Sequence, residues 1–298
     1  MAETYRTCDP TFNAVRELLA QQVANGSEVG ASICVNINRK DVLGIWSGHA
    51  DLERTKPWDK DTLTPAWSCS KVVTNLAALM LIDRGLIDLH GLVRVRGKRQ
   101  RERQGIPHLE PFVWCSWLGT GNHLGRSLRY EEINRLACEG SLCGGLLVNT
   151  AGITKSLKQF IADEIVGPLG ADFTLGLPEK KDIRRTTFQR RNNRAPGFRG
   201  AEIGAANGFS NVRSLVRIGS MVSLDGTVDG KQYFSPGVID RLCEEQISEI
   251  DMVTDYSCVS GLVSGFLCPR LFLGFQRVAF AFVLDGLKRL LSWISIVG

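Results

Sequence analysis

The stretch TPAWSCSKVVTNLAALMLIDRGLIDLH, residues 64–90, constrains the fold of this chain more than any other segment. From Val72 to Ile82 almost every position is apolar, so the pattern predicts a helix that is buried on nearly all sides. Gly85 follows where a glycine would end that helix. Such a helix needs a surrounding core, and 298 residues with 44% hydrophobic content are ample for one.

Four further segments have clear patterns. Residues 11–24 predict an amphipathic helix, and residues 30–51 predict two strands joined by a polar turn, which is a hairpin. Residues 155–180 predict an amphipathic helix, a Gly-Pro-Leu-Gly break and a strand. Residues 205–246 predict two helices that flank a glycine-rich turn region. The chain therefore combines helices and strands.

Charge and cysteine content narrow the classes of function. A net charge of +5 on 36 basic and 31 acidic residues favours nucleic-acid binding only if it is concentrated on one face. The first residues show no signal-peptide pattern, and no uncharged apolar run reaches transmembrane length. The sequence has no Cys-x-x-Cys pair and no His at metal-site spacing from a cysteine. Its cysteines are Cys8, Cys34, Cys69, Cys115, Cys138, Cys143, Cys243, Cys258 and Cys268. We therefore expect reduced thiols, a cytoplasmic location and no metal.

Ser68 and Lys71 stand three residues apart at the entrance to the buried helix. A serine hydroxyl is a weak nucleophile until a neighbouring base takes its proton, and residues i and i+3 of a helix share a face. Burial beside Val72, Leu76 and Leu79 would lower the lysine pKa towards neutrality, and the helix N-terminus would favour a developing oxyanion. The alternative is structural: Ser68 is an N-cap and Lys71 a solvated residue of the first turn.

The surroundings of this pair decide between the two interpretations. Ser-x-x-Lys is followed by a buried helix and by Gly-Leu-Ile-Asp-Leu, and two later segments read SLKQFIADEIVGPLGADFTLG and AEIGAANGFSNVRSLVRIGSMVSLDGTVDGKQYFSP. In this order they resemble the β-lactamase-related serine hydrolases: class C β-lactamases, penicillin-binding peptidases, esterases and fungal transesterases. The last segment is similar to the esterase-like branch. The resemblance covers residues 11–90 and 155–248.

Two motifs of that family have no clear counterpart. The second motif, Tyr-x-Asn or a variant with tyrosine, is expected between the nucleophile helix and residue 155, where Tyr130 is the only tyrosine and has Glu at the third position. The third motif, Lys-[ST]-Gly or His/Trp-x-Gly, is expected near the C-terminus, but FLGFQRVAFAFVLDGLKR contains no such triad. The resemblance therefore implies Ser68 and Lys71 as catalytic residues and leaves the other roles unassigned.

Residues 92–153 fit no regular period and contain the basic run RVRGKRQRERQG. If the codons from Val95 to Trp117 are shifted by one base, Trp114 and Trp117 must both become glycine, and permitted codons give a family-like N-G-K and V-x-H-x-L-S-H-x-S-G. A shifted reading frame or a mispredicted exon would explain this segment, and another near the C-terminus would explain residues 265–298. The basic run itself has three interpretations: a by-product of the shift, a solvated loop, or a nuclear-localisation or nucleic-acid patch.

The resemblance implies a fold and a reaction. We expect an α/β (α+β) fold of the β-lactamase/transpeptidase type in one incomplete domain over residues 1–298, with an antiparallel sheet flanked by helices, a mainly helical lobe and the site between them. The reaction would be hydrolysis or acyl transfer through an acyl-enzyme on Ser68. Its substrate would be a small ester, amide or acyl-thioester, with no cofactor, no nucleic-acid partner and no membrane. The alternative is a truncated, non-catalytic relative or a mispredicted gene product.

Overall fold

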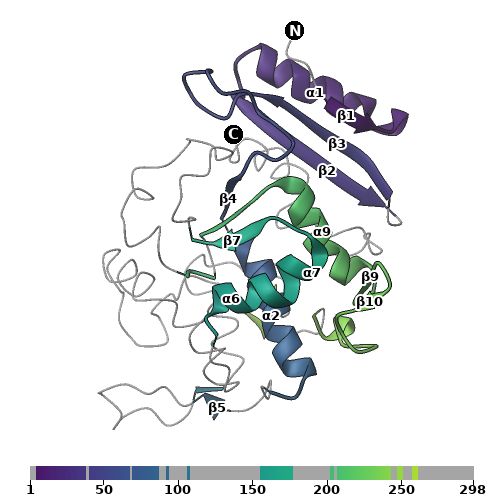
Figure 1. Cartoon of the computed structure of the whole chain (residues 1–298), viewed down its shortest axis with the longest axis vertical. Coiled ribbons are helices and arrows are strands. Elements are labelled where there is room, and N and C mark those ends of the chain that lie inside the picture. The colour runs from purple at the N-terminus through teal and green to yellow at the C-terminus, as the bar shows by residue number, and fades with distance from the viewer. Residues whose placement is uncertain are drawn as a thin grey trace, which may run out of the picture.

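A computed structural model describes residues 5–37, 40–67, 69–86, 92–93, 106–107, 155–176, 202–204, 207–242, 247–250 and 257–260. The predictions for residues 265–298, and for 92–153 apart from two short strands, lie outside these residues. Figure 1 shows a sheet covered by one helix at one end and a mainly helical lobe at the other. The two parts meet where helix α9 contacts strand β2.

The N-terminal sheet is antiparallel, with strand order β1-β3-β2. Its strands are β1 (Tyr5–Cys8), β2 (Gly30–Ile37) and β3 (Lys40–Gly48), and β2 and β3 form the predicted hairpin. Helix α1 (Asn13–Ala24) covers one face and buries Leu19 and Val23 against Ala31, Leu43 and Ile45. The prediction of an amphipathic helix at residues 11–24 is thus confirmed; its first residues form the 3-10 turn η1 (Pro10–Phe12).

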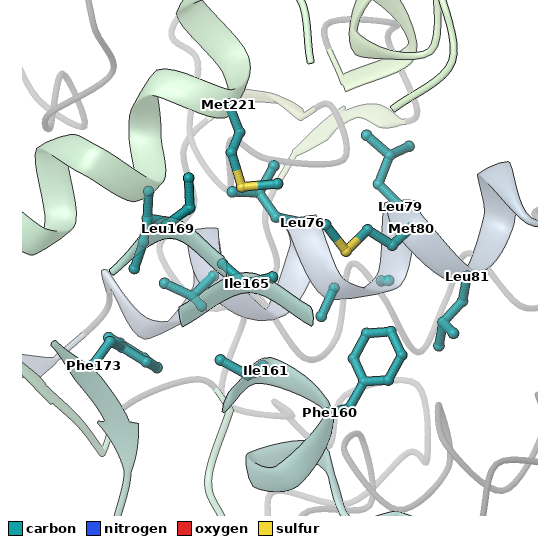
Figure 2. Packing of buried hydrophobic residues seen from close by; sticks show 14 of the residues in the cluster. Leu76, Leu79, Met80, Leu81, Phe160, Ile161, Ile165, Leu169, Phe173 and Met221 are labelled. Carbon is teal, nitrogen blue, oxygen red and sulfur yellow. The ribbon is translucent and has the colours of Figure 1, made fainter. Parts of the chain in front are cut away.

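Helix α2 (Ser70–Asp83) is the centre of the helical lobe. It follows strand β4 (Thr64–Trp67) after a very short connection and ends before Gly85, whose φ of 68° confirms the predicted glycine stop. Leu76, Leu79 and Met80 are at most 1% exposed, as expected for a helix that is apolar on most sides. Figure 2 shows α2 running between Met221 on one side and the helices of residues 157–169 on the other.

Residues 155–176 build a second wall of this core. A capping box of Ser156 and Gln159 starts helix α6 (Leu157–Ile161), which continues through a π-helical stretch, η3 (Ala162–Val166), into the single turn α7 (Gly167–Leu169). Strand β7 (Phe173–Leu175) then follows, so the predicted helix and strand are confirmed, whereas Gly167–Leu169 continue the helix, which ends only at Gly170.

A second antiparallel sheet, of order β4-β8-β7, supports α2. Its central strand β8 (Gly208–Ser210) leads directly into helix α9 (Val212–Ser223), which begins where the Asn211 side chain accepts the backbone N–H of Ser214 at 2.9 Å. Central placement of β8 brings residues near 208 against residues near 67, although they lie far apart in the chain.

One prediction for residues 205–246 is wrong. After α9, the Gly-Thr-Val-Asp-Gly segment forms a small hairpin of β9 (Thr227–Val228) and β10 (Lys231–Gln232). Within the described residues, which stop at 242 here, the expected second helix is the 3-10 turn η5 (Ile239–Leu242), and Pro236 and Gly237 keep the backbone before it out of a helix.

The remaining strands pair in two short antiparallel ribbons: β5 (Leu92–Val93) with β6 (Ile106–Pro107), and β11 (Ile247–Ile250) with β12 (Ser257–Ser260). Antiparallel sheets with flanking helices agree with the predicted mixed α/β class.

Candidate active site

The predicted nucleophile falls, by sequence, in the connection between β4 and α2. The backbone N–H of Cys69 donates to the carbonyl of Ala66 at 2.9 Å, which closes this connection. Helix α2 begins at Ser70, with Cys69 at the cap position and no side-chain cap bond, so Ser68 precedes the cap. Lys71 is the second residue of the helix.

Ser68 and the side chain of Lys71 lie outside the residues that the structure describes. The hydrogen bond between the Ser68 hydroxyl and the Lys71 amine therefore stays a prediction. What the structure does place is the framework on both sides of Ser68: strand β4 before it and the first turn of α2 after it. A helix N-terminus presents unpaired backbone N–H groups and partial positive charge, which stabilise a negative oxygen nearby.

Gly208 contacts the chain on both sides of the predicted nucleophile. It is paired with Trp67 across β4 and β8, and its backbone N–H donates to the hydroxyl oxygen of Ser70 at 2.8 Å. A Cβ atom at this position would stand 2.6 Å from the Ser70 hydroxyl oxygen and 2.7 Å from the ring of Phe173. Only glycine therefore allows this close approach of β8 to α2.

One helical turn further on, Thr74 holds the same segment. Its hydroxyl donates to the carbonyl of Gly204 at 2.9 Å, and a Cβ on Gly204 would stand 2.8 Å from the Thr74 hydroxyl oxygen. Within the segment, the Asn207 side chain accepts the backbone N–H of Ile203 at 3.0 Å, and the Asn207 N–H donates to the Ile203 carbonyl. These bonds tie Ile203 to Asn207, and the Thr74 bond fastens Gly204 to α2.

These contacts form a buried polar layer beneath the candidate site. Its members are at most 4% exposed: Ser70, Thr74, Asn75, Asn207 and Ser210. Sequence analysis missed all five. The available signal was the pair of hydroxyl residues at positions 70 and 74 in an otherwise apolar helix, because residues i and i+4 share a face and buried polar groups need partners.

The three apolar residues expected beside Lys71 are packed in the core around α2. Leu76 and Leu79 are fully buried, and Val72 is half-buried against the same core. The Lys71 amine lies outside the described residues, so the lowering of its pKa stays a prediction.

The structure does not supply the missing second motif. Tyr130 lies outside the described residues, as does the C-terminal segment expected to carry the third motif. Tyr233 follows strand β10, and the Lys231 amine lies 4.9 Å from its ring centroid. Burial raises the pKa of Tyr233, so its phenol holds its proton more tightly than a free tyrosine.

The described residues contain neither a candidate metal site nor a candidate membrane-spanning helix. In the parts of the chain that the structure places, no group of three or more His, Cys, Asp or Glu side chains could hold a metal ion. Among the same residues, no helix is both long enough and apolar enough to cross a bilayer.

A hollow of about 230 Å³ is lined by residues of the 225–240 segment and by none of those around Ser68.

Comparisons with known proteins agree with this geometry. A family model described as "Beta-lactamase" matches residues 15–120. "Esterase/beta-lactamase LipL" of Mycobacterium tuberculosis (strain ATCC 25618 / H37Rv) is 24% identical over 80% of this chain and 68% of its own length. Residues 15–120 thus resemble the β-lactamase family model, and most of the chain resembles the mycobacterial esterase/β-lactamase.

Solved structures show the same fold. A family VIII carboxylesterase matches with a TM-score of 0.71 and 22% identity, over 87% of this chain and 82% of that one. EstCE1, described as a hydrolase with promiscuous acyltransferase activity, matches with a TM-score of 0.61 and 16% identity, over 85% and 81%. The predicted β-lactamase/transpeptidase-like fold is therefore confirmed.

Proposed function

We propose that this β-lactamase-related protein is a serine hydrolase or acyltransferase of the esterase type, with Ser68 as nucleophile and Lys71 as its base. The observation that supports the proposal is that Ser-x-x-Lys falls, by sequence, between strand β4 and the buried helix α2. This arrangement combines a nucleophile, a base on the next turn and a helix N-terminus in one short segment. The esterase name of the mycobacterial relative supports the same class.

The chemistry proceeds in two half-reactions. Ser68 Oγ attacks the carbonyl carbon of the substrate while Lys71, working with a tyrosine, accepts the hydroxyl proton. Backbone N–H groups, including that of Ser68, stabilise the tetrahedral oxyanion. The intermediate collapses to an acyl-Ser68 ester, and the leaving alcohol, amine or thiol takes up the proton. Water or an acceptor alcohol then attacks the acyl group, passes its proton to the base, and releases Ser68.

The substrate class follows from the same chemistry. A serine nucleophile with a lysine base acts on small esters, amides or acyl-thioesters and needs neither metal nor organic cofactor. We also propose that the protein acts in the cytoplasm, which is consistent with the reduced state of Cys8, Cys34 and Cys69. Cell fractionation with a C-terminal tag tests the location.

A second candidate has its own observation. Residues 92–153 and 265–298 lack the family's second and third motifs, and the forced glycines at the shifted codons of Trp114 and Trp117 match the family pattern. On this account the chain is a non-catalytic relative produced by a frame error. Inspection of the coding DNA near codons 92 and 154 decides between the two candidates.

The direct test of the proposed function is labelling with a fluorophosphonate, which reacts with activated serines. We expect the label on Ser68, located by peptide mass spectrometry, and its loss in Ser68→Ala and Lys71→Ala. Ser235→Ala is the matched control, because Ser235 is exposed and belongs to the segment after β10. Label that persists in Ser68→Ala, or that is absent from the unaltered chain, contradicts the proposal.

A further inference from the structure

Ser70, one of the two residues between the predicted nucleophile and the predicted base, is itself in an unusual position. Ser70 is fully buried, and its hydroxyl oxygen accepts the backbone N–H of Gly208, 138 residues away, at 2.8 Å. Serine in the first turn of a helix usually serves the helix's own backbone. This contact instead ties the start of α2 to the central strand of the second sheet.

The hydrogen bond between Ser70 and Gly208 is important because Gly208 has a second partner near Ser68. Gly208 is also the strand partner of Trp67, the residue immediately before Ser68. A single residue of β8 thus holds the chain at positions 67 and 70, while the Cys69 N–H bond to Ala66 closes the connection locally. Ser68 falls between these fixed points by sequence, so a shift of Gly208 relative to Ser70 would be transmitted to it.

We propose that Ser70 is a positioning residue that acts through Gly208 to hold the nucleophile segment in register with β8. The proposal rests on the proposed function, since it assigns Ser70 a role only if Ser68 is the nucleophile. Ser70 does not touch substrate and takes no proton. Its contribution is geometric, and in active sites a displacement of about 1 Å can cost roughly 10²-fold in rate.

Thr74 provides a matched control on the same helix. It is 2% exposed, it makes one buried hydroxyl bond to the same 203–208 segment, and it lies one turn further from Ser68. Thr74→Val removes that bond and nearly preserves the shape of the side chain. Its effect should therefore be confined to stability, whereas Ser70→Ala removes a bond of the same kind beside the nucleophile.

The experiment measures the second-order rate of fluorophosphonate labelling at Ser68, together with the melting temperature, for the full chain and both variants. We expect Ser70→Ala to lower the labelling rate about 10- to 100-fold, while Thr74→Val stays within about twofold of the unaltered chain at a similar loss of melting temperature. The pH midpoint of labelling should be the same in Ser70→Ala and in the unaltered chain, because Ser70 does not transfer the proton.

Each other outcome overturns a specific statement. Labelling of Ser70→Ala at the unaltered rate, or equal losses in both variants, shows that Ser70 is only structural. A shifted pH midpoint shows that Ser70 takes part in proton transfer. Absence of Ser68 labelling in the unaltered chain overturns the proposed function, and the positioning role with it.

Discussion

The hydroxyl of Thr74 donates a hydrogen bond to the carbonyl oxygen of Gly204 across a sequence separation of 130 residues. The bond joins the two family-like parts of the chain, residues 11–90 and 155–248, in one buried interface. Because an unpaired buried hydroxyl or carbonyl costs free energy, the interface is specific as well as apolar. The framework around the candidate site is thus assembled from both parts, whatever residues 92–153 contribute.

The first prediction concerns Gly208→Ala. The new Cβ would stand 2.6 Å from the Ser70 hydroxyl oxygen and 2.7 Å from the Phe173 ring, so β8 must move away from α2. We expect a loss of about 1–3 kcal/mol in the free energy of unfolding, as is typical of overpacking in a core. Urea denaturation measures it. Gly44→Ala is the control. Nothing lies within 4 Å of a Cβ added at this position, so the free energy of unfolding of this variant should be unchanged or slightly higher.

Local patterns predicted much of this fold. The apolar run of α2, the glycine stop at Gly85 and the alternation of β2 and β3 are signals that neighbouring residues carry by themselves. The contact of Ser70 with Gly208 has no such signal, since it joins residues 138 positions apart in the chain. The wrong second helix after α9 shows the same limit, because helical spacing was outweighed by turn residues.

The candidate site could likewise be predicted only in its local part. Ser68 and Lys71 could be named because a short motif and its helix lie within one stretch of sequence. The hydrogen bonds of Ser70 and Thr74 could not, since their partners, Gly208 and Gly204, lie far away in the chain. The missing second and third motifs fall on residues outside the described part of the chain, so their absence is known from sequence alone.

A second prediction concerns stability at acid pH. Asp51 accepts the hydroxyl of Thr55 and the backbone N–H groups of Thr55 and Lys56, and these bonds, the Thr55 hydroxyl foremost, hold the pKa of Asp51 below its usual value. Because the folded pKa is lower than the unfolded value of about 3.9, this stabilisation is present above that value and is lost as pH falls through the folded pKa.

Thr55→Val should therefore destabilise the protein at pH 7, and the difference from the unaltered chain should narrow when the pH is lowered towards 3. Urea denaturation at several pH values measures this difference. Thr62→Val is the control: its hydroxyl accepts the backbone N–H of Asp59 at 2.7 Å, so its cost should not depend on pH in this way. Parallel curves for the two variants would contradict the role of the Asp51 carboxylate.

A third prediction concerns cysteine reactivity. Burial, with a further contribution from Asp41, raises the pKa of the Cys34 thiol to about 12, so almost no thiolate is present at pH 8. Cys8 is half-buried at the end of β1. We expect iodoacetamide at pH 8 to modify Cys8 and to leave Cys34 unmodified until the protein is denatured, as measured by peptide mass spectrometry. Equal rates for both cysteines in the folded protein would show that β2 opens readily.

The last prediction concerns turnover by the chain as it stands. Hydrolysis of a short p-nitrophenyl ester should be weak or absent although Ser68 and Lys71 are present. The tyrosine of the second motif would share the proton transfer, and such assistance is typically worth about 10²–10⁴-fold in rate. The third-motif strand would supply an oxyanion donor, and loss of one donor costs roughly 10²–10³-fold in a comparable site.

These two losses need not multiply, because residues of one site act as a unit, but either brings a modest esterase close to background. The comparison sets this chain against a version with the reading frame restored across residues 92–153, each beside its Ser68→Ala variant. We expect Ser68-dependent turnover to rise by at least about 10²-fold on restoration, because the second motif returns with that segment. Rapid Ser68-dependent turnover by the unrestored chain would mean that other residues complete the site, and Tyr130 would be the first to test.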